Sequence, residues 1–350
     1  MTRDEIAARL GHEVQLTHED LSGLDLSGLD FSGLGLDQVD FSGSDLRGTR
    51  FRESSVYKCD FSDVNFEGAT FQAAAVYQSA FPRTKWRGSD MRVANFYESD
   101  FADADLRGAN VTLSTFAASD CSNMKLGATL LDRVTMAQSN LDGLDLTASR
   151  IERSTFFETD LTKAKLEKVS WDKVVVFKTS LAGLDFTGLE LGFGQMVDVN
   201  LEGCNFTNAK IPNSNFKDSL LKGAKFDGAE APNTLFVEAD IEGVSFKKAR
   251  LTQSIFISAK ASNADLRGAD LEMSIWQKAH AVGALFTDAR LSYADFSYAD
   301  IRNADFTGAD VFRTRFHSVK DQGAQFSGNR AVALGDDEEL AKAERFKSSY

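Results

Sequence analysis

The side chains that most often carry out chemistry in enzymes are few and scattered in this chain. The histidines and cysteines are His12, His18, His280, His317, Cys59, Cys121 and Cys204. Their spacing fits no metal site, and the sequence has no glycine-rich phosphate loop and no nucleophile elbow. We therefore expect no enzyme activity, no metal and no cofactor.

Aspartate recurs at a fixed spacing over most of the chain. One series advances in steps of twenty or a multiple of twenty: Asp20, Asp40, Asp60, Asp100, Asp120, Asp160, Asp240 and Asp300. Carboxylates stacked about 5 Å apart repel each other, but a backbone amide that donates to each one relieves that cost. The acidic series therefore has two interpretations, a structural one and mimicry of the phosphate backbone of DNA.

A period of five residues governs the whole chain. Every fifth residue from Leu16 to Phe326 is apolar, and Asp321 is the one exception among 63 positions. We call these residues the centres. The residue two places before a centre is nearly always small, and 20 of the 26 glycines lie two places after one. Neither a helix nor an alternating strand has this period. A unit this short must stack on its neighbours, so the period predicts a solenoid.

The units resemble those of a known family. Ala104-Asp105-Leu106-Arg107-Gly108 and Ala264-Asp265-Leu266-Arg267-Gly268 are similar to the A(D/N)LXX motif of pentapeptide-repeat proteins. The resemblance implies an all-β fold, a right-handed quadrilateral β-helix with four units in each 20-residue coil. It also implies that the centre and the small residue two places before it point inward. The repeats would then form about 15–16 uninterrupted coils.

The two ends of the chain depart from the repeat, and we expect short helical caps there. Thr2-Arg3-Asp4-Glu5 has the form of a capping box, with Ile6 and Leu10 behind it. After Gly335, the run Asp336-Asp337-Glu338-Glu339 suits a helix N-terminus, and Leu340 and Phe346 are expected to face the last coil. We divide the chain into an N-terminal cap at 1–15, a solenoid at 16–330 and a C-terminal tail at 331–350. The tail helix either caps the solenoid or, as in the gyrase-binding pentapeptide proteins it resembles, forms a dimer contact.

The composition indicates a protein of the cytoplasm. The sequence has no secretory signal and no apolar run that could enter a membrane. The cysteines fall on inward positions, so we expect them to be buried and unpaired. Lys163, Lys168, Lys173 and Lys178 lie on successive units and would surround one coil, which argues against direct binding of nucleic acid. Export by a system that needs no signal peptide is the alternative localisation.

Function is therefore expected on the outer faces, which the residues flanking the centres form. Three of the four faces are polar just after the centre, and the fourth is apolar. This fourth face predicts a long stripe for protein binding or self-association, because soluble monomers seldom expose such surfaces. The alternative interpretation is that these side chains favour β-pairing alone. The predicted binding residues of the apolar stripe are Tyr57, Tyr77, Tyr97, Phe157, Phe177, Val237 and Ile257.

Two classes of function follow. The first is a non-catalytic scaffold that binds a protein partner or forms a homodimer. The opening residues and the Leu-Ser-Gly-Leu-Asp units at 21–34 resemble pentapeptide-repeat proteins associated with type VI secretion, which implies an accessory or effector-loading role. The second is a DNA mimic that modulates DNA gyrase through Asp20, Asp40, Asp60, Asp100 and Asp120. Residues 16–115 carry 16 acidic and 9 basic side chains, so the mimicry would be confined to about the N-terminal third of the chain.

Overall fold

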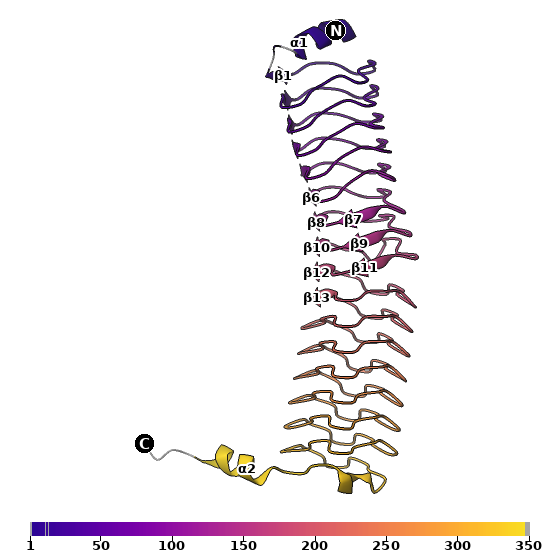
Figure 1. Cartoon of the computed structure of the whole chain (residues 1–350), viewed down its shortest axis with the longest axis vertical. Coiled ribbons are helices and arrows are strands. Elements are labelled where there is room, and N and C mark those ends of the chain that lie inside the picture. Colours follow the sequence, from indigo (N-terminus) through magenta and orange to yellow (C-terminus); the bar gives the residue numbers. More distant parts are fainter. Residues whose placement is uncertain (1, 11, 13, 347–350) are drawn as a thin grey trace. The chain divides into compact units, whose positions relative to one another are not determined.

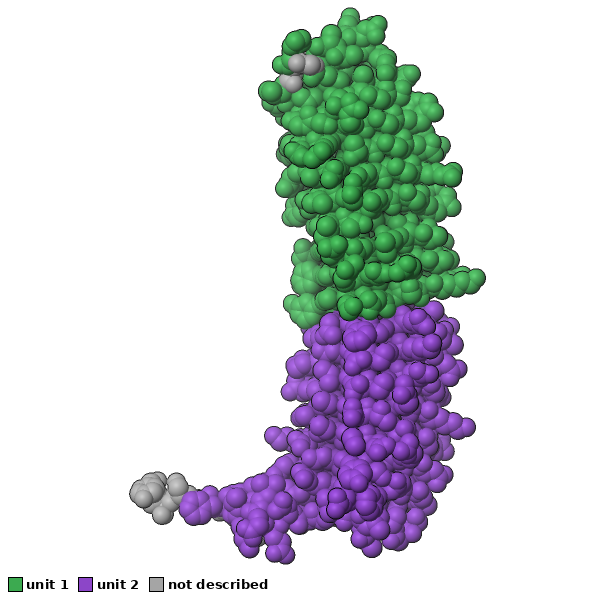
Figure 2. Space-filling model, in the orientation of Figure 1, with its two compact units in different colours: residues 1–180 green, residues 181–350 purple. Residues whose placement is uncertain are grey.

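The computed structural model describes residues 2–10, 12 and 14–346. The chain forms two compact units, Met1–Ser180 and Leu181–Tyr350, which Figure 2 distinguishes by colour. Within each unit, successive coils stack on one another (Figure 1). The prediction of an all-β solenoid is confirmed.

Unit 1 is built from three-residue strands that pair in parallel. Each residue pairs with the residue twenty places further on, as Tyr57 does with Tyr77. One sheet holds β1 (Gln15–Thr17), β2 (Gly35–Asp37), β3 (Ser55–Tyr57), β4 (Ala75–Tyr77), β5 (Asn95–Tyr97), β6 (Thr115–Ala117), β8 (Thr135–Ala137), β10 (Thr155–Phe157) and β12 (Val175–Phe177) in that spatial order. A second sheet holds β7 (Leu130–Asp132), β9 (Arg150–Glu152) and β11 (Ser170–Asp172).

Unit 2 continues the same repeat with fewer regular strands. It contains β13 (Gln195–Val197), the 3-10 helix η1 (Asn329–Val332) and α2 (Glu338–Arg345). Between β13 and η1 the coils are joined by isolated parallel bridges, such as Leu235 with Ile255, again twenty residues apart. Each 20-residue coil therefore holds four five-residue units in both parts of the chain.

The inward register predicted from the period is confirmed. Every centre from Leu16 to Phe316 is buried, and so are small residues two places earlier, such as Ala104. With the exception of Lys163, the residues two places after the centres from Leu16 to Phe326 adopt a left-handed backbone conformation, with φ of 71° at Gly308 and 63° at Tyr293. Glycine adopts this conformation without strain, which explains why most glycines of the chain lie at this corner position.

Aromatic rings stack from coil to coil inside both units. In unit 1 the ring centroids of Phe41 and Phe61 are 4.8 Å apart, with their planes 5° from parallel. In unit 2 the corresponding distance from Phe206 to Phe226 is 4.6 Å. Offset pairs of this kind contribute about 0.5–1.5 kcal/mol each beyond the burial of their area. The inward rings therefore stabilise the stack of coils.

The first coil is capped by α1 (Arg3–Leu10), as predicted. Glu5 Oε2 accepts from the Thr2 amide at 2.8 Å, and the Thr2 hydroxyl accepts from the Glu5 amide at 3.3 Å, which completes the capping box. Ile6 is fully buried, and Arg3 donates to the carbonyl of Ser27 at 2.6 Å. The helix therefore closes the N-terminal end of unit 1.

The C-terminal end of unit 2 differs from the prediction. Leu340 and Phe346 do not face the last coil, since they are 39% and 79% exposed. Instead, the guanidinium of Arg330 lies 4.2 Å from the ring centroid of Phe316 and covers the last coil. Polar contacts hold the segment around α2: the amide of Asp337 donates to His317 Nδ1 at 3.1 Å, and the hydroxyl of Tyr298 donates to Glu344.

Candidate functional site

The parallel register of unit 1 lines up the predicted apolar residues on one outer face. Each of them follows a buried centre in the large sheet, and each pairs with the next residue of the set. We call this set the aromatic column: Tyr57, Tyr77, Tyr97, Ala117, Ala137, Phe157 and Phe177. The structure therefore brings together the five unit 1 residues predicted from the sequence.

The aromatic column is accessible to a partner. Tyr57, Tyr77 and Tyr97 are between 40% and 46% exposed, and the two phenylalanines are half-buried. The rings of Tyr77 and Tyr97 are 6.0 Å apart, and those of Phe157 and Phe177 are 5.8 Å apart. Ala117 and Ala137 separate the two aromatic groups, so the surface has a low middle section between two ridges.

Unit 2 has a smaller apolar group on its outer surface. Lys217 follows the centre Phe216 and pairs with Glu238 at 3.2 Å, so it interrupts the column between Val197 and Val237. The predicted apolar stripe is therefore not continuous in unit 2. The prediction did not take Lys217 into account. Beyond the interruption the half-buried residues of the group are Leu235, Val237, Ile255, Ile257 and Ile275.

The first acidic series is bonded to its own backbone. Oδ1 of Asp40 accepts from the amide of Ser42 at 2.8 Å, and Asp60 and Asp100 make the same bond to the residue two places on. Asp120 does so too, at 2.9 Å from the amide of Ser122. At Asp20 the hydroxyl and amide of Ser22 lower the pKa of the carboxyl. The structural interpretation is thus supported for all five predicted residues.

A second acidic series stands just before the centres of the next face, and three of its members pair with arginine: Asp25, Asp45, Asp105, Asp145 and Asp185 form the series, and the first three are paired. The guanidinium of Arg47 lies 2.6 Å from Asp45, and that of Arg107 lies 2.5 Å from Asp105. The hydrogen bonds from these arginines lower the pKa of both aspartates. By contrast, no described lysine or arginine makes an ion pair with Asp40, Asp60 or Asp100. Asp300 of the same series differs, because the guanidinium of Arg302 lies 2.8 Å from its carboxylate. The carboxylates of Asp40, Asp60 and Asp100 are therefore not neutralised by an ion pair.

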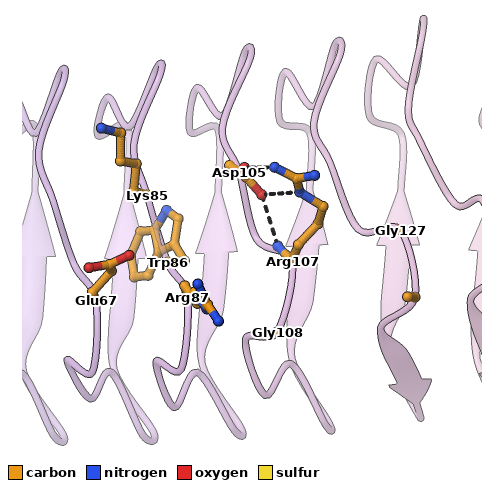
Figure 3. Close-up of a pocket in the computed structure, with 9 residues that line it drawn as sticks. Glu67, Lys85, Trp86, Arg87, Asp105, Arg107, Gly108 and Gly127 are labelled. Carbon is orange, nitrogen blue, oxygen red and sulfur yellow. Dashed lines mark hydrogen bonds and ion pairs between the residues drawn. The ribbon is translucent and has the colours of Figure 1, made fainter.

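A recess of about 640 Å³ lies on another face of unit 1, above the buried ring of Trp86 (Figure 3). Glu67, Lys85 and Arg87 line it, together with the Asp105–Arg107 pair that Figure 3 shows. The lining contains charged groups but no histidine, cysteine or hydroxyl side chain. We therefore assign no reaction to it.

The sequence did not indicate the charged cluster on the smaller sheet of unit 1. Asp132 follows the centre Leu131 on one of the faces that the sequence predicts to be polar, yet it is only 7% exposed. Its two oxygens lie 2.7 Å from the guanidinium of Arg153 and 3.1 Å from that of Arg133. Both arginines occupy left-handed corner positions. The five-residue period gives no information on such pairs, because both partners stand at variable positions of the unit.

The cysteines are free and buried, as predicted. Burial raises the pKa of Cys59 to about 11, which makes its thiol unreactive near neutral pH. Among the described residues, no group of histidine, cysteine, aspartate and glutamate side chains is arranged to hold a metal ion. Likewise, none of the helices in the described ranges has the length and apolar character needed to cross a bilayer.

Comparison with known families agrees with the repeat and the fold. One family model, described as pentapeptide repeats (9 copies), matches residues 36–76. A second, described as pentapeptide repeats (8 copies), matches residues 12–48, 81–112, 200–236, 234–272 and 277–308, and together they cover more than half of the chain. The chain belongs to the pentapeptide-repeat family. No curated protein matches it.

Three solved structures illustrate what this pentapeptide-repeat protein is similar to. Full-length QnrB1, a plasmid-mediated fluoroquinolone resistance protein, is 15% identical over 66% of this chain and 100% of that chain, with a TM-score of 0.34. HetL, involved in heterocyst differentiation regulation in the cyanobacterium Nostoc, is 16% identical over 96% and 94%, with a TM-score of 0.21. A mannuronic acid specific polysaccharide lyase from human gut microbiota is 9% identical over 99% and 92%, with a TM-score of 0.28.

Proposed function

We propose that this pentapeptide-repeat protein is a non-catalytic scaffold that binds a protein chain through the aromatic column of unit 1. The observation that supports this proposal is the in-register exposure of Tyr57, Tyr77 and Tyr97 beside Phe157 and Phe177. Tyrosine and other aromatic side chains contribute most of the binding energy in many interfaces. Val237 and Ile257, in the apolar group of unit 2, are a secondary contact in this proposal.

Replacing Tyr57, Tyr77, Phe157 and Phe177 together with serine tests the proposal. We expect the variant to remain folded, because these side chains lie outside the core, and to lose the associated protein chain. The measurement is affinity purification of the tagged full chain from its native host, with bound proteins identified by mass spectrometry and folding followed by circular dichroism. Retention of the same bound protein by a folded variant would contradict the proposal.

Type VI secretion is the proposed setting of the scaffold, because residues 1–6 and the units at 21–34 resemble proteins associated with that system. In this setting the chain acts in the cytoplasm as an accessory protein or leaves the cell with an effector. The identity of the purified partner tests this finer proposal.

A second candidate function is modulation of DNA gyrase by mimicry of DNA. The observation that favours it is the set of carboxylates at Asp40, Asp60 and Asp100, which bond backbone amides but pair with no described cation. Changing Asp20, Asp40 and Asp60 to lysine distinguishes the two functions. The scaffold predicts that protein capture persists in this variant, whereas loss of a measured gyrase inhibition would favour the mimic.

A further inference from the structure

The aromatic column also indicates which chain it binds. We propose that it binds the same column of a second copy of this protein, face to face, with the two stacks of coils antiparallel. The two-fold axis would run along the strands, between β5 and β6. This inference rests on the proposed function, because it names the partner of that surface.

The first argument is the size of the side chains along the column. A two-fold axis between Tyr97 and Ala117 places Tyr97 over Ala117 of the second copy and Tyr77 over Ala137 of the second copy, because adjacent coils are in register. Tyr77 and Tyr97 of each copy then fill the low middle section of the other, and Tyr57 meets the ring of Phe157 at each end of the contact. Two sheets pack face to face when their side chains interdigitate in this manner.

The second argument is charge on the edge that follows the column. The same two-fold rotation places Lys58 opposite Glu158 of the second copy, and Gln78 opposite Gln138 of the second copy. All four are exposed. The ammonium of Lys58 lies 4.9 Å from the ring centroid of Tyr57. Glu158 accepts from Gln138 Nε2 at 2.8 Å and lies 3.6 Å from Lys178 Nζ of its own chain, so in the dimer it would be shared between Lys178 and Lys58 of the second copy. Because the contact is symmetric, each dimer would contain two Lys58–Glu158 pairs.

The third argument comes from the corner residues that lie just before the strands of the large sheet. Val93 and Leu113 occupy left-handed corners, with φ of 63° and 62°, and they are 44% and 42% exposed. A β-branched residue such as valine is strained in that conformation. The proposed axis places Val93 opposite Leu113 of the second copy. A contact between the two copies gives these exposed apolar side chains a role that the fold of one chain does not.

A parallel dimer is the competing arrangement. A two-fold axis along the stack of coils would place Lys178 opposite Lys173 of the second copy and Tyr97 opposite Asn95. It would also place Lys58 opposite Glu53 and Glu158 opposite Arg153, so the charges along these edges do not distinguish the two arrangements. The fit of the side chains does, because the tyrosine ridge would no longer meet the alanines. The antiparallel arrangement therefore fits the surface better.

The size of the surface sets the expected affinity. From Tyr57 to Phe157 the column spans five coil spacings, about 24 Å at the usual distance between strands. A single face of this length belongs to the small interfaces, below about 1,200 Å² in total, which are typical of weak and transient complexes. The dimer is therefore expected to form in a concentration-dependent manner.

Charge reversal in the full-length protein tests the arrangement. We expect Lys58→Glu and Glu158→Lys each to weaken dimerisation about tenfold, since each places like charges opposite one another twice. The double variant restores the pairs with reversed sign and should dimerise within about twofold of the wild type, since the complementary pairs are re-formed. The matched control is Lys125→Glu, which makes the same charge change on another face and should have no effect. Dimerisation constants come from sedimentation equilibrium over a concentration series.

Three results would overturn the inference. One is a chain that stays monomeric throughout the series, and another is a double variant that dimerises no better than the single ones. The third is rescue of Lys58→Glu by Glu53→Lys, because the parallel dimer pairs those two positions. None of these decides the proposed function, which fails only if the folded serine variant still captures the protein bound by the wild type.

Discussion

Phe226→Asp is expected to unfold unit 2. The ring of Phe226 is fully buried, with ring centroids at 4.6 Å and 5.0 Å from those of Phe206 and Phe246 in the adjacent coils. Loss of a buried phenylalanine costs about 3–5 kcal/mol, and an unpaired carboxylate in its place adds a desolvation cost. The free energy of unfolding of a domain is only about 5–15 kcal/mol. We therefore expect loss of β-structure in the circular dichroism spectrum and a much lower urea concentration at the midpoint of unfolding.

Lys222→Asp is the matched control, because it introduces the same side chain in the preceding unit of the same coil. Lys222 is exposed and loses only a surface pair with Glu242, 3.1 Å away. Exposed ion pairs contribute little to stability. Equal destabilisation by the two variants would show that the inward register is wrong.

Trp86→Ala is expected to produce the second largest loss, in unit 1. The indole is fully buried and stacks on Phe66 at 4.2 Å, and its Nε1 donates to the hydroxyl of Thr84 at 2.8 Å. The cavity left by alanine should cost about 3–5 kcal/mol, measured by urea unfolding.

Trp86→Phe keeps a ring in the stack and removes the indole hydrogen bond, so most of the stability should remain. Arg87→Ala, at the exposed neighbour, should leave the urea midpoint nearly unchanged. If alanine at position 86 were tolerated as well as alanine at position 87, the ring stack of unit 1 would not be the source of its stability.

The interior of this protein could be predicted from the sequence almost completely. One five-residue period determines which side chains point inward. The burial of every centre from Leu16 to Phe316 can therefore be predicted by counting along the sequence. The capping box at Thr2 and Glu5 could also be predicted from the sequence, because both partners lie within one helical turn. Local spacing is sufficient in both cases.

The C-terminal end could not be predicted in this way. There Leu340 and Phe346 suggested an apolar cap, yet the last coil is covered by Arg330 and the segment around α2 is held through His317 and Tyr298. These contacts join residues at unrelated positions of the repeat, so no period reveals them. The interruption of the apolar stripe at Lys217 was not predicted for a different reason. One polar residue on an outer face leaves the period of the inward residues unchanged.

Photo-cross-linking on the aromatic column tests the central claim most directly. A benzophenone amino acid would replace Tyr77 in one version of the full-length protein, Arg87 on another face in a second, and Ser42 beside the acidic series in a third. After irradiation in the native host, we expect covalent adducts to a protein chain, either a partner or a second copy, from position 77 and not from the other two. Adducts from position 42 or 87 but none from position 77 would contradict the assignment of the aromatic column as the binding surface.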